Sequence, residues 1–262
     1  MPCIRCLQWP SQAADWPTRH RYFGWPDSAT VDAVVRNGCD VVGVAHPLCK
    51  HDEWMEKHQW RLSFSRAEIV LLNSWTREQQ IVYHMLRTFM KTERLTQNYK
   101  QYGASRFSDY HVKMLMLWAC ELSPRTWWEC ESNLVGISVK LMHFLNEWLT
   151  SWHGQHYFIS DAYFSDYFDI VDIETISAVA KSTSVDSLTQ WLVDNYICKC
   201  AELCPENIPL LHSDIETKKM LHDSVTAILE WRDHIVCKTL AEQLVVQYFS
   251  ATDFLEDFRW LT

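Results

Sequence analysis

Residues 60–68 read WRLSFSRAE, and this stretch marks a change from an α/β segment to a helical one. Arg61, Ser63 and Ser65 alternate with apolar residues, so in a strand the three polar side chains share one face. Glu68 follows Ser65 by three positions, which is the spacing of a capping box at the start of a helix. The stretch therefore predicts a strand that leads directly into a capped helix.

The chain before this stretch differs from the rest. It holds three Trp-Pro pairs, and each proline keeps the residue before it out of helical geometry. We expect a short helix over residues 28–36, capped by Asp27 or Ser28, and a strand over residues 39–45, which read CDVVGVA. This segment is typical of the tail of an α/β domain.

The chain after this stretch is patterned for helices. Thr76 and Gln79 form a second capping-box pair, and Ser108 can cap a helix that stops before Pro124. Apolar residues repeat at helical spacing over residues 133–149, and further helices are expected over 185–197 and from Ser213 onward. The expected fold is mostly α, a helical bundle preceded by a small α/β remnant. We divide the chain into an α/β remnant (1–64), a helical domain (65–168) and an additional helical extension (170–262).

Composition limits the classes of function. With 48% hydrophobic residues and 14 Trp among 262 residues, the chain can build a large core in which several indoles are buried. The net charge of −9 disfavours unspecific binding of nucleic acid, although Arg5, Arg19 and Arg21 could form a local basic face.

Location and cysteine chemistry follow from simple patterns. No run of about 18 apolar residues exists and no signal peptide is visible, so we expect a cytoplasmic protein without a membrane span. The 10 Cys are then expected to be reduced. The spacings Cys3/Cys6 and Cys198/Cys200/Cys204 could suggest a metal, but neither has a second ligand pair, so buried thiols are favoured.

Taken alone, the residues offer little catalysis: the chain has no Gly-rich phosphate loop, no nucleophile elbow and no zinc-protease motif. A guanidinium, two hydroxyls and a carboxylate at Arg61, Ser63, Ser65 and Glu68 could together bind a purine edge and a phosphate. The alternative is purely structural: a half-buried strand feeds a helix, and Glu68 caps it with Ser65.

Three motifs resemble one family. Residues 60–68 are similar to the Trp-Arg-Leu-Ser-Phe-Ser-x-x-Glu signature of cyclic GMP–AMP synthase and the male-abnormal (Mab-twenty-one-like) family. Residues 107–113, FSDYHVK, resemble that family's Phe-Ser-Ser-Tyr-His-Val-Lys, and residues 156–159, HYFI, resemble its Asn-Tyr-Phe-Ile-Pro, with Ser160 in place of the proline. The matches run in the same order over roughly residues 25–168.

The resemblance implies a fold and a set of site residues. It implies the helical domain of a nucleotidyltransferase that makes cyclic dinucleotides from ATP and GTP in innate immune sensing of nucleic acid. Arg61 matches an arginine that contacts a base or the product, and Tyr110 matches a tyrosine that stacks on a purine; the alternative for Tyr110 is a core aromatic. The implied nucleotide-binding residues are Arg61, Ser63, Ser65, Glu68, Arg87, Ser108 and Tyr110.

The departures from the family pattern concern catalysis. The family binds Mg²⁺ through three carboxylates that precede the segment beginning here at Pro2, so we expect no catalytic or metal-binding residue in this chain and no activity from it alone. Asp15 and Asp27 are poor substitutes. Ala45 stands in place of a base-reading lysine, and Asp109 replaces a serine.

The resemblance also bears on partners. A zinc thumb that grips DNA is missing, because the segment between Ser74 and Phe89 has no Cys. In this respect the chain resembles the RNA-sensing and orphan relatives more than the DNA sensor, so double-stranded RNA is a candidate ligand of a full-length form, while the choice between RNA, DNA and no nucleic acid stays open. Two other hypotheses stay open: a non-catalytic Mab-like developmental or scaffold protein, and a gene fragment that folds poorly because its sheet exposes an edge near Cys39–Val44.

Overall fold

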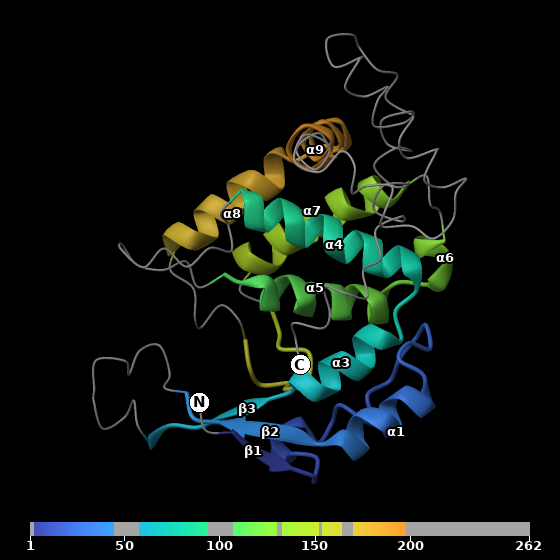
Figure 1. Cartoon of the computed structure of the whole chain (residues 1–262), viewed down its shortest axis with the longest axis vertical. Helices are drawn as coiled ribbons and strands as arrows, with labels where there is room; N and C mark the ends of the chain where they lie inside the picture. The colour runs from blue at the N-terminus through green and yellow to red at the C-terminus, as the bar shows by residue number, and fades with distance from the viewer. Residues whose placement is uncertain are drawn as a thin grey trace, which may run out of the picture.

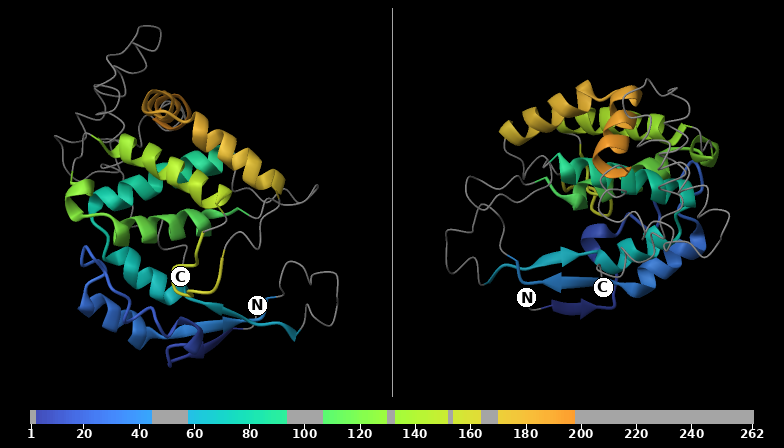
Figure 2. Two further views of the ribbon diagram at one scale, coloured as in Figure 1. Left: turned by 180° about the vertical axis from the view of Figure 1, so that it is seen from behind. Right: turned by 45° about the horizontal axis from the view of Figure 1, so that its top comes forward.

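The computed structural model describes residues 3–44, 58–93, 107–129, 133–151, 154–163 and 170–197. A small sheet with two helices lies at one end of the molecule, and a bundle of helices lies beyond it (Figures 1 and 2). The fold is thus mostly helical with a small sheet at the N-terminus, which confirms the predicted fold class.

The sheet has three antiparallel strands in the order β1 (Cys3–Cys6), β2 (Cys39–Val42) and β3 (Arg61–Ser63). Because β2 pairs with a strand on each side, the exposed edge expected at Cys39–Val44 is wrong; the edges are β1 and β3. The edge named as the reason for poor folding is therefore not at Cys39–Val42, which is the middle strand.

Two helices accompany the sheet, α1 (Ser28–Asn37) and α3 (Ser65–Asn73), and they pack against each other. Asp27 is the N-cap of α1 and accepts a hydrogen bond from the backbone N–H of Thr30 at 2.7 Å, so the predicted helix and one of its two candidate caps are confirmed. α1 ends at Gly38, where φ is +66° and a Cβ would collide with the carbonyl oxygen of Cys6.

The bundle consists of α4 (Arg77–Thr92), α5 (Asp109–Leu122), the short α6 (Arg125–Trp128), α7 (Leu134–Thr150), α8 (Ile170–Ser182) and α9 (Val185–Leu192), which continues as a π-helix over Val193–Ile197. α7 lies at its centre against α4, α8 and α9, while α5 packs on α4 (Figure 1). Thr76 and Gln79 form the predicted capping box. No described helix has the length and apolarity that a membrane crossing requires.

Other expectations fall on residues that the structure does not describe. The helix expected from Ser213 onward and the cysteines at 198, 200 and 204 lie outside the described residues, as does Ala45. In the described part of the chain, Cys3, Cys6, Cys39 and Cys120 are free thiols.

An aromatic cluster joins the two layers. Trp16, Phe64 and Phe158 are all at most 3% exposed, and the rings of Phe64 and Phe158 stack with centroids 4.5 Å apart. Trp9 lies over the same group, 5.5 Å from Phe64. The segment 154–163 thus reaches from the bundle down to the start of α3, as Figures 1 and 2 both show. Burial of these indoles confirms that tryptophans fill the core.

Candidate functional site

The seven residues implied as nucleotide-binding are called the cradle here: Arg61, Ser63, Ser65, Glu68, Arg87, Ser108 and Tyr110. They lie on four elements. Arg61 and Ser63 are the first and last residues of β3, Ser65 begins α3, and Glu68 lies one turn into α3. Arg87 lies on α4, and Ser108 and Tyr110 lie at the start of α5.

The strand side of the cradle is open. Arg61 is exposed on the edge strand β3, and the side-chain oxygens of Ser63 and Ser65 lie 2.9 Å apart in a hydrogen bond. Ser65 is already the first residue of α3 rather than part of the strand. The strand and the helix are therefore confirmed, but the shared polar face spans a strand end and a helix start.

The capping box predicted for Ser65 and Glu68 is wrong. The N-cap of α3 is Phe64, whose side chain has no hydrogen-bond acceptor to cap the helix and packs in the aromatic cluster. The Glu68 carboxylate points inward and accepts a hydrogen bond from Nζ of Lys113 on α5 at 2.6 Å. With side chains 5% and 12% exposed, this is a buried ion pair that ties α3 to α5.

Arg87 also has a partner. Its Nε donates to Oδ2 of Asp109 at 2.9 Å, so the residue that departs from the family pattern supplies the acceptor. Both side chains are about one-third exposed, which leaves this pair open to solvent. Tyr83 lies beneath the pair; burial chiefly raises the pKa of its hydroxyl, with Arg87 opposing and Asp109 adding to the shift.

Tyr110 is held by a histidine that was not among the expected site residues. The Tyr110 hydroxyl lies 2.7 Å from Nε2 of His156, while Nδ1 of His156 accepts the backbone N–H groups of Phe158 and Ile159, each at 3.1 Å. Because Nδ1 accepts two hydrogen bonds, the imidazole proton sits on Nε2 and is donated to the tyrosine oxygen. Tyr110 is half-buried and packs against the core, so it is both a core aromatic and a surface group.

Electrostatics keep His156 neutral. Burial, and to a lesser extent the nearby Arg61, lower its pKa to about 4. Because the charge of Arg61 lowers the pKa of His156 and His156 contacts Tyr110, the strand side of the cradle lies near the start of α5. The sequence signal for His156 was its place in the HYFI motif, where the family pattern has asparagine.

Ser108 is the N-cap of α5, as expected. Its backbone N–H donates to Nδ1 of His111 at 3.0 Å, and its hydroxyl lies 3.2 Å from the same nitrogen. Burial lowers the pKa of His111 to about 4. The serine therefore has a capping task, and its hydroxyl is engaged with His111 rather than directed outward.

The expected basic face is not formed by Arg19 and Arg21. The Arg19 guanidinium pairs with Glu121 at 2.7 Å, and Nε of Arg21 lies 3.7 Å from the same buried carboxylate oxygen. Within the described ranges, no group of three or more His, Cys, Asp or Glu side chains is arranged to hold a metal ion. The arrangement is thus an exposed cation with two hydroxyls near a half-buried tyrosine, and the buried Glu68–Lys113 ion pair joins α3 to α5 beneath them.

Comparison with known proteins identifies two domains in this chain. Residues 1–74 match the Mab-21 protein nucleotidyltransferase domain, and residues 78–184 match the Mab-21 protein HhH/H2TH-like domain.

Similar curated proteins come from insects. A "Protein mab-21-like" of Drosophila melanogaster is 31% identical over 129 residues, covering 47% of this chain and 32% of the relative. Proteins of the same name from Aedes aegypti and Anopheles gambiae are each 29% identical, covering 52% and 55% of this chain and 34% and 38% of the relative. The aligned part is thus about a third of the length of these relatives. Two domain matches in their family order, with relatives of the same name, show that the chain belongs to the Mab-21 family.

Proposed function

We propose that this chain is the nucleotide-binding lobe of a cyclic GMP–AMP synthase-like nucleotidyltransferase. It binds ATP or GTP through the cradle and does not transfer nucleotides by itself. The observation that carries the proposal is the position of Arg61, which is exposed on the same strand as Ser63 of the Ser63–Ser65 hydroxyl pair and whose charge lowers the pKa of His156, the partner of Tyr110.

The strand side supplies the recognition of phosphate. A guanidinium binds a phosphate through two parallel hydrogen bonds, and hydroxyls beside it donate to further phosphate oxygens. The Tyr110 ring supplies stacking, and a base stacked on an aromatic side chain contributes roughly 1–3 kcal/mol. His156 holds the phenol by its oxygen, so the ring is kept in one orientation for a base.

The structure changes the roles proposed for two cradle residues. Glu68 is neutralised by Lys113 and supports the site from within. Arg87 is already paired with Asp109, whose negative charge repels a phosphate, so we propose that its contribution to binding is smaller than that of Arg61.

Magnesium does not fit the described residues. Asp27 is occupied as the cap of α1, and Asp40 accepts both of its hydrogen bonds from Arg66, at 3.1 and 3.2 Å. Two-metal nucleotidyl transfer needs several carboxylates around one point. We propose that Mg²⁺ is bound only in a full-length form, which acts in the cytoplasm in innate immune sensing with double-stranded RNA as its ligand.

Calorimetric titration with ATP and GTP tests the proposal. We expect binding that Arg61→Ala and Tyr110→Ala each weaken about tenfold, a change of 1.4 kcal/mol. Arg125→Ala is the control, because that side chain is 80% exposed and, within the described part of the chain, its ion pair is with Glu129, the residue directly after its own short helix. Equal affinity in all four proteins would exclude a nucleotide site at the cradle.

A second candidate is a non-catalytic Mab-like protein that acts in development or as a scaffold for protein partners. The observation that favours it is that Glu68, Arg87 and Tyr110 are satisfied inside the chain by Lys113, Asp109 and His156, so no ligand is needed to explain them. Absence of ATP and GTP binding to the unmodified protein would leave this candidate in place of the first.

A further inference from the structure

We infer that Arg19 is a positioning residue of the cradle, which acts on Tyr110 through the segment that carries His156. The inference concerns the proposed nucleotide site, but its first step, the placement of His156, does not depend on any nucleotide. Arg19 comes from the N-terminal segment, far from the cradle in sequence.

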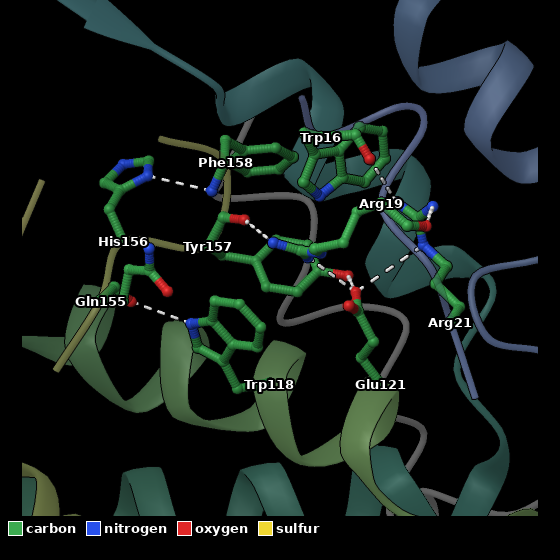
Figure 3. Close-up of polar contacts among 9 residues, drawn as sticks. All are labelled: Trp16, Arg19, Arg21, Trp118, Glu121, Gln155, His156, Tyr157 and Phe158. Atoms are coloured by element: carbon green, nitrogen blue, oxygen red, sulfur yellow. Dashed lines mark hydrogen bonds and ion pairs between the residues drawn. The ribbon is translucent and has the colours of Figure 1, made fainter. Parts of the chain in front are cut away.

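Arg19 bridges α5 and the segment 154–163 (Figure 3). Its Nη1 donates to the backbone oxygen of Tyr157 at 3.0 Å, and its Nη2 donates to Oε2 of Glu121 at 2.7 Å. The guanidinium carbon lies 4.4 Å from the ring centroid of Trp118 and 4.8 Å from that of Tyr157. The planar group is therefore fixed by two hydrogen bonds and two aromatic faces.

Glu121 gives this bridge its strength. Its side chain is 3% exposed, and the Oε2 atom that binds Arg19 also accepts the Tyr157 hydroxyl at 2.7 Å. Arg21 lies 3.7 Å away, and burial is the main reason that the pKa of Arg21 is lowered. A buried carboxylate with these partners loses much of its stabilisation if one cation is removed.

The residues on both sides of His156 are held by their backbone oxygens. Arg19 binds that of Tyr157, and the indole N–H of Trp118 donates to that of Gln155 at 2.9 Å. Trp118 lies on α5, the helix that also begins with Tyr110. We call Arg19 and Trp118 with these two hydrogen bonds the clamp. The clamp fixes the segment 154–163 relative to α5, which carries Tyr110.

The fixed loop determines the state of the imidazole. Its backbone N–H groups at Phe158 and Ile159 point at Nδ1 and select the Nε2–H form, which donates to Tyr110. Among the described residues, the charged and titratable groups near His156 include Arg61 from β3, with Tyr110 and His111 from α5. If Arg19 is lost, the Tyr157 backbone is released and this selection weakens.

Nitrogen NMR of the histidine side chains tests the clamp without nucleotide. In the unmodified protein, we expect His156 as a single Nε2–H form at pH 7 with a midpoint near pH 4. Arg19→Met should give mixed tautomers and move that midpoint toward the ordinary value of about 6.5. His111 takes its hydrogen bond from Ser108, so its tautomer at pH 7, where both imidazoles are neutral, serves as the internal control and should not change.

Further variants make the outcome decisive. Arg19→Lys keeps the charge beside Glu121 but cannot reach both acceptors in the same geometry, so it should shift His156 in the same direction; it also answers the question if Arg19→Met does not fold. Arg125→Met, on the exposed pair with Glu129, should leave His156 unchanged. A single Nε2–H form in both Arg19 variants would overturn the inference.

ATP titration of the same proteins separates the two proposals. If the cradle binds ATP, Arg19→Lys should weaken binding several-fold although Arg19 is not part of the cradle. If the unmodified protein does not bind ATP, the proposed function fails, while a shift of the His156 tautomer still supports the clamp. Unchanged ATP affinity together with a shifted tautomer would overturn the step from His156 to the cradle.

Discussion

The two sides of the cradle differ in how their polar groups are satisfied. On the helix side, Glu68 is buried against Lys113 and Tyr110 is held by His156. On the strand side, Arg61 and Ser65 are exposed at the surface. One family motif therefore serves two purposes: its buried members join α3 to α5, and its exposed members are available to a ligand. Substitutions on the two sides should separate stability from binding.

The largest loss of stability is expected from Lys113→Met. It leaves the Glu68 carboxylate buried without its cation, and removal of one partner of a buried pair costs about 3–5 kcal/mol. Urea unfolding at pH 7 measures the effect, with Arg125→Met as the control that should change stability by less than about 0.5 kcal/mol. A loss as small as that of the control would show that water reaches Glu68.

Acid is the next strongest way to disturb the helix side. The folded-state pKa values of His111 and His156 are lowered to about 4, against 6.5 in the unfolded chain. Below pH 6.5 the two histidines are therefore protonated in the unfolded state but stay neutral in the folded state. The free energy of unfolding decreases as pH falls from 6.5 toward 4. We expect a loss of about 2 kcal/mol for each histidine between pH 7 and 4.5.

Unfolding curves at these two pH values measure this loss. His156→Gln removes one of the two titrating groups and should make stability less dependent on pH over the interval. Its stability at pH 7 is a separate quantity and does not enter the comparison. An unchanged pH dependence in this variant would contradict a buried, neutral His156.

Local patterns predicted the elements well, and long-range partners poorly. Asp27 and Thr76 cap their helices through atoms three residues away, so the sequence alone was sufficient. The same local logic failed at Glu68, whose partner Lys113 is 45 residues distant. Ser65 was the partner of Glu68 that lay nearest in the sequence. In the structure the N-cap of α3 is instead the buried Phe64.

The partners of Arg19 in the clamp could not be predicted from local sequence patterns either. Arg19 and Glu121 are 102 residues apart, and a count of nearby arginines suggested a basic face instead. A partner of opposite charge at such a distance leaves no periodic signal. His156 could have been found, because it stands within a quoted motif where the family has a different polar residue.

Arg87→Met should lower the free energy of unfolding by less than Lys113→Met or the change to pH 4.5. The Arg87–Asp109 pair is about one-third exposed on both sides, and pairs of this kind contribute roughly 0.2–1 kcal/mol. Thermal unfolding at low and high salt is the measurement, since salt screens an exposed pair and should reduce the difference from the unmodified protein. A difference that is independent of salt would indicate lost packing against Tyr83 instead.

The smallest effect on stability is expected from Arg61→Ala and Ser65→Ala. Both side chains are exposed, and the Ser65 hydroxyl bonds only to another surface hydroxyl, so each change should alter stability by less than about 0.5 kcal/mol. Urea unfolding and ATP titration of the same samples then give the decisive pair of values. Weakened binding at unchanged stability assigns the strand side to recognition. A stability loss above about 1 kcal/mol would instead mean that Arg61 supports the fold, and the distinction between the two sides of the cradle would fail.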